Sequence, residues 1–205
     1  MTLSGTPQIT YTESYSACGA PTTVNTNYSI WKPGGTVSIT WGGAEPGTNN
    51  AIAGYRVYWK SGGAPTTSSY TNYADVTSSP YSFTVPNERG TTYYFKVLTR
   101  GTVSGYDSGI SSVQATTKVN YLPDAPMVNV SSTRIKSTGG TVTFTTSPGS
   151  DSDSGQNLSV YWADSTNGSK TKVENNTYTT PTLSASKTYY FWTYDGLEYS
   201  SSYAS

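Results

Sequence analysis

The residues of this chain best suited to chemistry are acidic. Asp151 and Asp153 alternate with serines ahead of Gly155, and Asp195 lies downstream. Alternating aspartates before a glycine supply hard oxygen ligands and resemble the start of a calcium-binding loop. No glutamate follows at the position that closes such a loop, and a flexible polar turn explains the same residues without an ion. Calcium at Asp151, Asp153 and Asp195 is therefore one hypothesis, and no other cofactor is expected.

Catalysis by other side chains has little support. The chain contains no histidine, so serine-triad and zinc-hydrolase sites are not expected. The single cysteine, Cys18, has neither a disulfide partner nor a histidine to activate it. The carboxylates could still form a glycosidase-like pair. Because most of them sit in Gly- and Ser-rich segments, solvated loop positions explain them better, and we expect no enzyme and no catalytic residue.

The overall charge also narrows the choice of partners. Twelve basic and twelve acidic residues cancel, and charged residues make up 12% of the chain. No basic patch points to nucleic acid, and no apolar run is long enough to insert in a membrane. The 19 tyrosines against 4 phenylalanines give a composition that suits half-buried β-strands.

The elements that position these residues come in two copies. Residues 21–40 align with residues 126–145 at a constant offset of 105, which matches Gly34 with Gly139 and Val37 with Val142. Residues 57–59 then match 160–162, and residues 92–95 match 188–191. The shrinking offset indicates that strands are kept while the loops between them vary.

Alternation with period two, bounded by turn residues, predicts short strands throughout both copies. In the first copy the expected strands span 22–31, 35–42, 53–61, 69–77, 81–86, 91–100 and 109–119. In the second they span 127–135, 140–147, 157–164, 170–175, 177–182, 187–195 and 199–205. We predict an all-β chain of two tandem antiparallel β-sandwiches. Its expected parts are an N-terminal extension or extra strand (1–20), domain 1 (21–119), a linker (120–126) and domain 2 (127–205).

Three landmarks in the first copy resemble the fibronectin type III family. The segment ending at Trp41 resembles the family's second strand, the segment from Tyr55 to Trp59 its third, and Tyr93 its corner tyrosine, whose hydroxyl is expected to bond upstream backbone. The second copy departs from the pattern with Thr146 in the place of Trp41. The resemblance implies structural roles for Trp41, Tyr55, Trp59, Tyr93, Trp162 and Tyr189.

The two ends of the sequence suggest a relation between copies. Residues 8–21 resemble residues 114–126, so the N-terminal segment looks like the last strand of a preceding sandwich, whereas the final strand of domain 2 is short. Two explanations remain open. The chain is an excerpt of a longer array, or the N-terminal strand of one copy completes the last domain of another, because an open sheet edge is a pairing template.

Strand alternation also predicts an outward row of aromatic side chains on neighbouring strands. Such a row could stack on sugar rings, bury against another subunit, or simply pair across strands. The candidate interaction surface consists of Tyr58, Tyr94, Tyr161, Tyr190, Trp192 and Tyr194.

Three classes of function remain: a structural or interaction module, a glycan-binding module and an enzyme. The first is favoured because sandwich cores and turns account for the strong signals. Domains resembling fibronectin type III occur in phage virions, as tail or capsid decorations, and in bacterial cell-surface proteins and extracellular glycosidases. We expect a virion or extracellular location, with virion or surface proteins, a second copy, or a glycan as partner. The alternative is a glycan-binding or spacer module of a bacterial surface protein or glycosidase.

Overall fold

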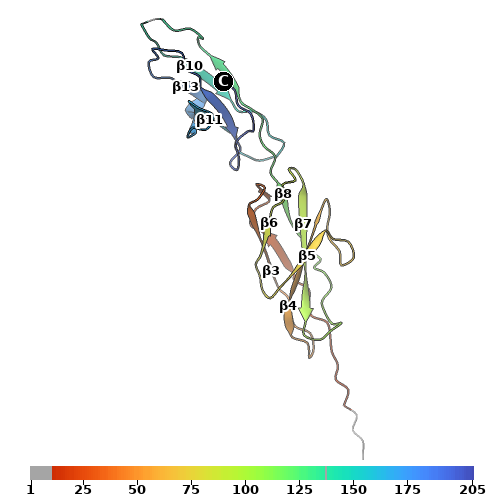
Figure 1. Ribbon diagram of the computed structural model, residues 1–205. Helices are drawn as coiled ribbons and strands as arrows, with labels where there is room; N and C mark the ends of the chain where they lie inside the picture. The colour runs from red at the N-terminus through yellow and green to blue at the C-terminus, as the bar shows by residue number, and fades with distance from the viewer. Residues whose placement is uncertain (1–10, 137) are drawn as a thin grey trace, which may run out of the picture. The chain divides into compact units, whose positions relative to one another are not determined.

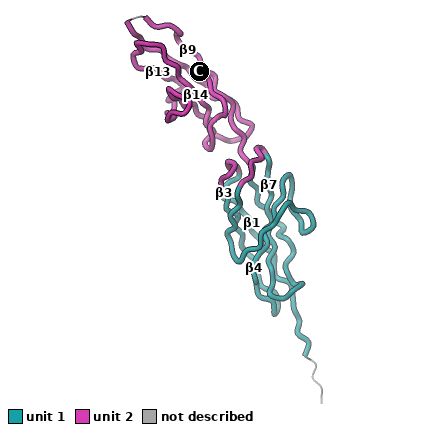
Figure 2. The backbone as a smooth tube through the Cα atoms, in the orientation of Figure 1, with its two compact units in different colours: residues 1–29, 36–84, 91–118 teal, residues 30–35, 85–90, 119–205 magenta. Residues whose placement is uncertain are grey.

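The computed structural model describes residues 11–136 and 138–205, which form short antiparallel strands joined by loops. The chain groups into two compact units (Figure 2). Unit 1 is formed by residues up to 29 together with 36–84 and 91–118, and unit 2 by residues 30–35, 85–90 and 119–205. In the part of the chain described, there is no helix with the length and apolar character needed to cross a membrane.

The strands follow the predicted alternation closely. The first half of the chain forms β1 (Thr23–Thr26), β2 (Ile30–Trp31), β3 (Thr36–Gly42), β4 (Ile52–Ser61), β5 (Asn72–Val76), β6 (Tyr81–Thr84), β7 (Thr92–Gly101) and β8 (Ala115–Val119). The second half forms β9 (Met127–Val130), β10 (Thr143–Ser147), β11 (Ser159–Ala163), β12 (Thr171–Lys172), the 3-10 turn η1 (Glu174–Asn176), β13 (Thr177–Thr179) and β14 (Tyr190–Tyr194).

In the first half of the chain, two sheets run in the orders β1-β3-β6 and β2-β8-β7-β4-β5 (Figure 1). In β3, Val37 and Ile39 are buried while Thr36 and Thr40 are exposed, as a strand with one face on the core requires. Rings meet across the two sheets, because Phe83 of β6 lies 4.9 Å from Phe95 of β7 between ring centroids. The core of unit 1 therefore lies between its sheets.

Unit 2 repeats the arrangement with sheets β13-β10-β9 and β12-β11-β14. Its core contains the buried residues Val160, Val173, Tyr189 and Phe191, packed against half-buried side chains of both sheets. The predicted fold class is confirmed: the chain is all-β and built as tandem antiparallel sandwiches.

Four predicted strands come out differently. The strand expected over 22–31 divides, since β1 pairs with β3 whereas β2 belongs to the other sheet. The strands expected over 170–175 and 177–182 shorten around η1, where Asn175 and Asn176 take left-handed φ values of 50° and 57° that end strand geometry. The strand expected over 199–205 pairs with β14 only through the isolated bridges at Tyr199 and Ala204.

Candidate functional site

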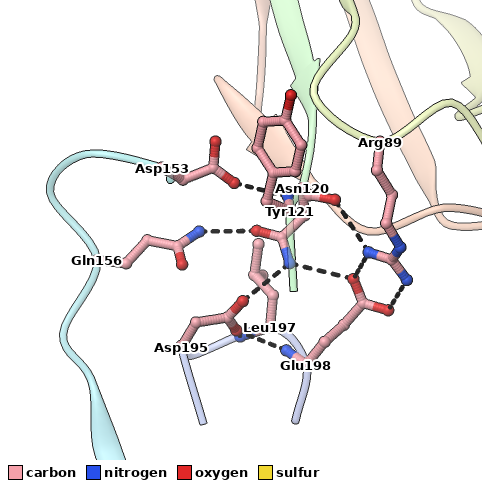
Figure 3. Close-up of polar contacts among 8 residues, drawn as sticks. All are labelled: Arg89, Asn120, Tyr121, Asp153, Gln156, Asp195, Leu197 and Glu198. Carbon is pink, nitrogen blue, oxygen red and sulfur yellow. Dashed lines mark hydrogen bonds and ion pairs between the residues drawn. The ribbon is translucent and has the colours of Figure 1, made fainter. Parts of the chain in front are cut away.

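A cluster of polar side chains in unit 2 surrounds Asn120 (Figure 3). This fully buried amide donates from Nδ2 to Asp195 Oδ2 (2.9 Å) and Glu198 Oε2 (3.1 Å). Its Oδ1 accepts from Gln156 Nε2 at 2.8 Å, and its backbone carbonyl accepts from Arg89 Nη1 at 2.9 Å. Each polar atom of the Asn120 side chain is therefore satisfied, which burial of an amide requires.

Arg89 and Glu198 form the charged part of this cluster. Arg89 Nη1 donates to Glu198 Oε2 at 2.8 Å and Nη2 donates to Oε1 at 2.9 Å, a two-pronged pair between partly buried side chains. The hydrogen bond from Arg89, aided by Asn120, holds the pKa of Glu198 below its ordinary value, although burial acts in the opposite direction. Glu198 is therefore a fixed carboxylate at neutral pH.

The calcium hypothesis for Asp151, Asp153 and Asp195 is not supported by the geometry. Within residues 11–136 and 138–205, no group of three metal-ligating side chains is gathered. The carboxylates accept from protein N–H groups instead: Asp153 from the backbone of Tyr121 at 2.7 Å, and Asp195 Oδ1 from Leu197 and Glu198 at 2.7 and 2.6 Å. Asp151 accepts from the Asp153 backbone at 2.7 Å. At least one oxygen of each carboxylate therefore accepts a hydrogen bond from backbone N–H groups of neighbouring loops.

The cluster joins four segments of unit 2: residues 85–90, 119–121, 150–156 and 195–198. Asp195 and Glu198 are brought together around one amide, but both are held by N–H donors. An arrangement of matched donors and acceptors rigidifies loops. Sequence reasoning missed Arg89 and Asn120, since their partners are distant along the chain and no local pattern links them, and it considered Glu198 only among the carboxylates that could form a pair.

The outward aromatic residues of unit 2 lie on one face of the sheet β12-β11-β14. Tyr161 contacts Tyr194 at 5.4 Å between ring centroids, and Tyr190 lies 6.3 Å from Trp192. Three further residues complete the group, because Tyr199 and Tyr203 pack their rings on these side chains and Lys170 Nζ lies 4.4 Å from the Trp192 ring. We call Tyr161, Lys170, Tyr190, Trp192, Tyr194, Tyr199 and Tyr203 the aromatic face of unit 2.

Two members of the predicted interaction surface are less accessible than expected. Tyr58 is 4% exposed and Trp192 is 5% exposed, so these two outward rings are covered by other side chains of the chain. Tyr58 lies on the outer side of β4 but is covered by Tyr70 and Tyr73, at 5.0 and 5.9 Å. Trp192 is covered in the same way by Tyr203, which is itself 45% exposed. Tyr94 is half-buried on β7.

The aromatic residues assigned structural roles all pack inward. Trp41 meets the Tyr55 ring edge-on at 5.3 Å, and Tyr93 lies 5.3 Å from Phe83. Trp59 stacks on Tyr81 at 5.7 Å, and the corresponding Trp162 stacks on Tyr178 at 4.0 Å. Tyr189 is buried in the core of unit 2. These rings join the two sheets of each unit.

A second buried amide, Asn50, organises the N-terminal side of unit 1. Its Nδ2 donates to the carbonyl oxygens of Ser16 (3.0 Å) and Tyr106 (2.8 Å), and its Oδ1 accepts from the Val103 backbone at 3.0 Å. Cys18 is buried beside it and donates from Sγ to the Asn50 carbonyl at 3.7 Å. This thiol is therefore part of the packing that holds residues 14–19 on unit 1.

Comparison with known proteins gives structural neighbours only. No protein-family model matches the sequence, and no curated protein does. Among solved structures, the chain is similar to the FN1–FN3 domains of chicken CNTN1, at 15% identity and a TM-score of 0.39, over 90% of this chain and 63% of that one. It is also similar to a two-domain fibronectin type III segment of chicken tenascin, at 14% identity and a TM-score of 0.36, over 88% and 94% of the two chains.

The chain thus spans 63% of the length of the CNTN1 structure that it matches. By its own strand order, it consists of two tandem antiparallel β-sandwiches.

Proposed function

We propose that this chain is a non-enzymatic structural and interaction module of a phage virion, placed on the tail or capsid, that binds neighbouring subunits through sheet edges and its aromatic face. The observation that carries the proposal is the aromatic face of unit 2, in which rings from β11, β14 and the segment 199–203 adjoin one another. Aromatic rings that pack tightly and leave an edge accessible are typical of interface anchors.

Two further features support this proposal. The chain lacks histidine and carries zero net charge, which suits a scaffold better than a reaction site. Its prominent carboxylates accept hydrogen bonds from backbone N–H groups of loops, as the contacts of Asp153 and Asp195 illustrate. A module of this kind acts through the surfaces it presents.

The direct test is to purify particles of a phage whose genome encodes the chain and to quantify it by mass spectrometry. A defined copy number per particle is the expected result. The variant Tyr203→Ser, which removes the most accessible ring of the aromatic face, should lower incorporation, while Tyr28→Ser, which removes a ring of similar exposure elsewhere, should not. Absence of the chain from the particles contradicts the proposal.

A glycan-binding module is the second candidate, because Tyr203 presents an accessible ring beside Trp192, and rings of this kind stack on sugars. Trp192 itself is too buried to be the stacking residue, so the discriminating variant is Tyr203→Ala. Binding to a polysaccharide array that this variant abolishes, with the melting temperature unchanged, would favour the glycan-binding module. Absence of binding across a broad polysaccharide array would rule out the glycan-binding module.

A further inference from the structure

In each unit, similar hydrogen bonds hold the segment on its N-terminal side, which is residues 14–19 in unit 1 and residues 119–124 in unit 2. In unit 1 the Gly19 N–H donates to the Glu45 carbonyl at 2.8 Å, and in unit 2 the Asp124 N–H, 105 positions later, donates to the Ser150 carbonyl at 2.8 Å. A glycine makes room for the segment each time. A Cβ at Gly47 would lie 2.1 Å from the Ser16 carbonyl oxygen.

In unit 2 a glycine at a different position, Gly149, makes this room, since a Cβ there would lie 2.4 Å from the Asp124 carbonyl oxygen. The next contacts also correspond, since the Ser16 N–H donates to the Thr48 carbonyl (3.2 Å) and the Tyr121 N–H to Asp153 Oδ2 (2.7 Å). Residues 14–19 are therefore bound to unit 1 as residues 119–124 are bound to unit 2.

This equivalence defines what residues 11–14 correspond to. The segment bound to unit 2 begins at the last residue of β8 (Ala115–Val119), so residues 11–14 hold the positions of residues 116–119 of that strand. They lie outside any strand and are exposed, with Tyr11 79% exposed. Residues 11–14 therefore hold the position of a final strand but pair with no sheet in the described part of the chain.

Unit 2 has the complementary feature, an edge of β14 that is only partly paired. In β7 and β8, Phe95 pairs with Ala115, and in unit 2 the corresponding Phe191 pairs with Ala204. The β7–β8 pairing then continues to Thr117 and Lys118. In the described part of the chain, no strand pairs with residues 187–189, which are the counterparts of that stretch.

One serine in each sandwich, Ser111 or Ser200, supports the correspondence between Ala115 and Ala204. Ser111 Oγ accepts from the Val97 backbone at 3.1 Å, and Ser200 Oγ accepts from the Thr193 backbone at 3.2 Å. In each case the serine backbone N–H returns a bond of 2.8 Å to the same residue of the neighbouring strand. Ala204 therefore occupies the place of Ala115.

A groove of about 320 Å³, lined by apolar and polar side chains, lies beside this open edge. Its lining includes Val130, Ile135, Val142, Phe144, Leu183 and Tyr189. Thr188 and Ser205 lie on the same groove, and Figure 1 marks the C-terminus beside β10. In β8 the corresponding inward side chains, Thr117 and Val119, are fully buried, which shows the role that a strand in this position performs.

We propose that residues 11–14 of one copy of this chain pair as a β-strand with residues 187–189 in unit 2 of a second copy and cover its groove. By correspondence with β8, Thr12 lies opposite Tyr189 and Glu13 opposite Thr188. Thr12 and Ser14 then face the groove, and the carboxylate of Glu13 lies on the outer side, near the ammonium of Lys187. The inference rests on the proposed function, since it names the sheet edge through which the module assembles.

The contact joins different surfaces of the two copies, so it can repeat from copy to copy and yield linear chains. Only a short strand is exchanged, and its main-chain hydrogen bonds form with an open edge. Association is therefore expected to be reversible and to depend on concentration.

The test is sedimentation of the 205-residue chain from roughly 10 µM to 1 mM, the range in which short-segment contacts bind. Average mass should rise with concentration. Deleting residues 1–14 should leave a monomer, whereas deleting residues 1–10, the matched control, should leave association intact. A third variant adds Thr-Lys-Val-Asn, the sequence of residues 117–120, after Ser205. This added strand should block association and raise the melting temperature of unit 2.

Other outcomes overturn the inference in distinguishable ways. Association that survives deletion of residues 1–14 leaves the proposed function standing and rejects this strand as the donor. A chain that stays monomeric throughout, but is stabilised by the added strand, assigns the groove to residues following Ser205 in a longer chain and rejects the second copy. A chain unaffected by the added strand rejects the groove as a strand site. Loss of the proposed function itself is read separately, from the composition of purified particles.

Discussion

Unit 1 and unit 2 share a core but differ at their edges. In both, a tryptophan of the central strand stacks on a tyrosine of the facing sheet, as Trp59 does on Tyr81 and Trp162 on Tyr178. In both, the tryptophan lies opposite a fully buried phenylalanine of the neighbouring strand, Phe95 or Phe191. The interior thus repeats almost residue for residue while the pairing at the last strand does not.

The difference at the edges has consequences for packing. Trp41 fills one end of unit 1, whereas Thr146 stands at the matching place in unit 2 and uses its hydroxyl to donate to the Asn176 carbonyl at 3.4 Å. The groove of unit 2 lies among Val142, Phe144 and their neighbours. Less apolar surface is therefore removed from water in unit 2, and it should be the less stable sandwich.

The largest effect is expected from deleting the equivalent core rings. Phe95→Ala and Phe191→Ala should each cost about 3–5 kcal/mol, with Phe191→Ala at the lower end because side chains beside a groove can relax into the space. Hydrogen exchange with mass spectrometry should show the loss of protection confined to the unit that carries the substitution. Equal loss in both units after either substitution would contradict the idea of two separate cores.

An intermediate effect is expected from the ion pairs. Glu198→Gln should destabilise unit 2 by about 1–3 kcal/mol, because it breaks a paired charge in a hydrogen-bonded cluster. The ion pair chosen for comparison in unit 1 is Arg56 with Asp75, at 2.6 Å. Its Asp75 is more exposed, so Asp75→Asn should cost less than about 1 kcal/mol.

The pH dependence of the two pairs has the same sign. Arg89 lowers the pKa of Glu198 and Arg56 lowers that of Asp75, by hydrogen bonding in each case. A carboxylate with a lowered folded pKa stabilises the protein above its unfolded value, about 4.5 for Glu and 3.8 for Asp, and the contribution disappears as the pH falls further. Denaturant melts at falling pH should therefore bring wild type and Glu198→Gln together, and a constant gap would reject Glu198 as the source.

Much of the fold followed from the sequence because alternation reports burial directly. The inward positions of Trp59, Tyr93 and Phe191 follow from period two, and Gly- and Ser-rich turns separate the strands. The division of the first strand between two sheets did not follow, since both halves carry the same alternation and only the pairing partner differs.

The accessible surface was harder to predict than the core. Tyr58 and Trp192 point outward as alternation requires, yet tyrosines from nonrepeating segments cover them, such as Tyr70 and Tyr203. A loop residue carries no periodic signal that tells which strand it will cover. The acidic run likewise suggested a cation, because composition shows the acceptors but not the N–H donors, such as that of Tyr121, which arrive from distant segments.

The smallest effect is expected from Tyr178 and Tyr81, the tyrosines that stack on Trp162 and Trp59. Burial, followed by the neighbouring Tyr189, raises the pKa of Tyr178 to about 12, and burial also raises the pKa of Tyr81. A raised folded pKa means that the stabilisation is complete below the ordinary tyrosine value of 10.0 and is lost as the pH rises through the folded value. Unit 2 should therefore lose stability between pH 10 and about 12, and Tyr178→Phe should remove part of that loss. Melting curves across this window, with Tyr81→Phe as the matched variant in unit 1, make the comparison. A Tyr178→Phe protein that loses stability as steeply as wild type would show that this ring is not the alkaline weak point of unit 2.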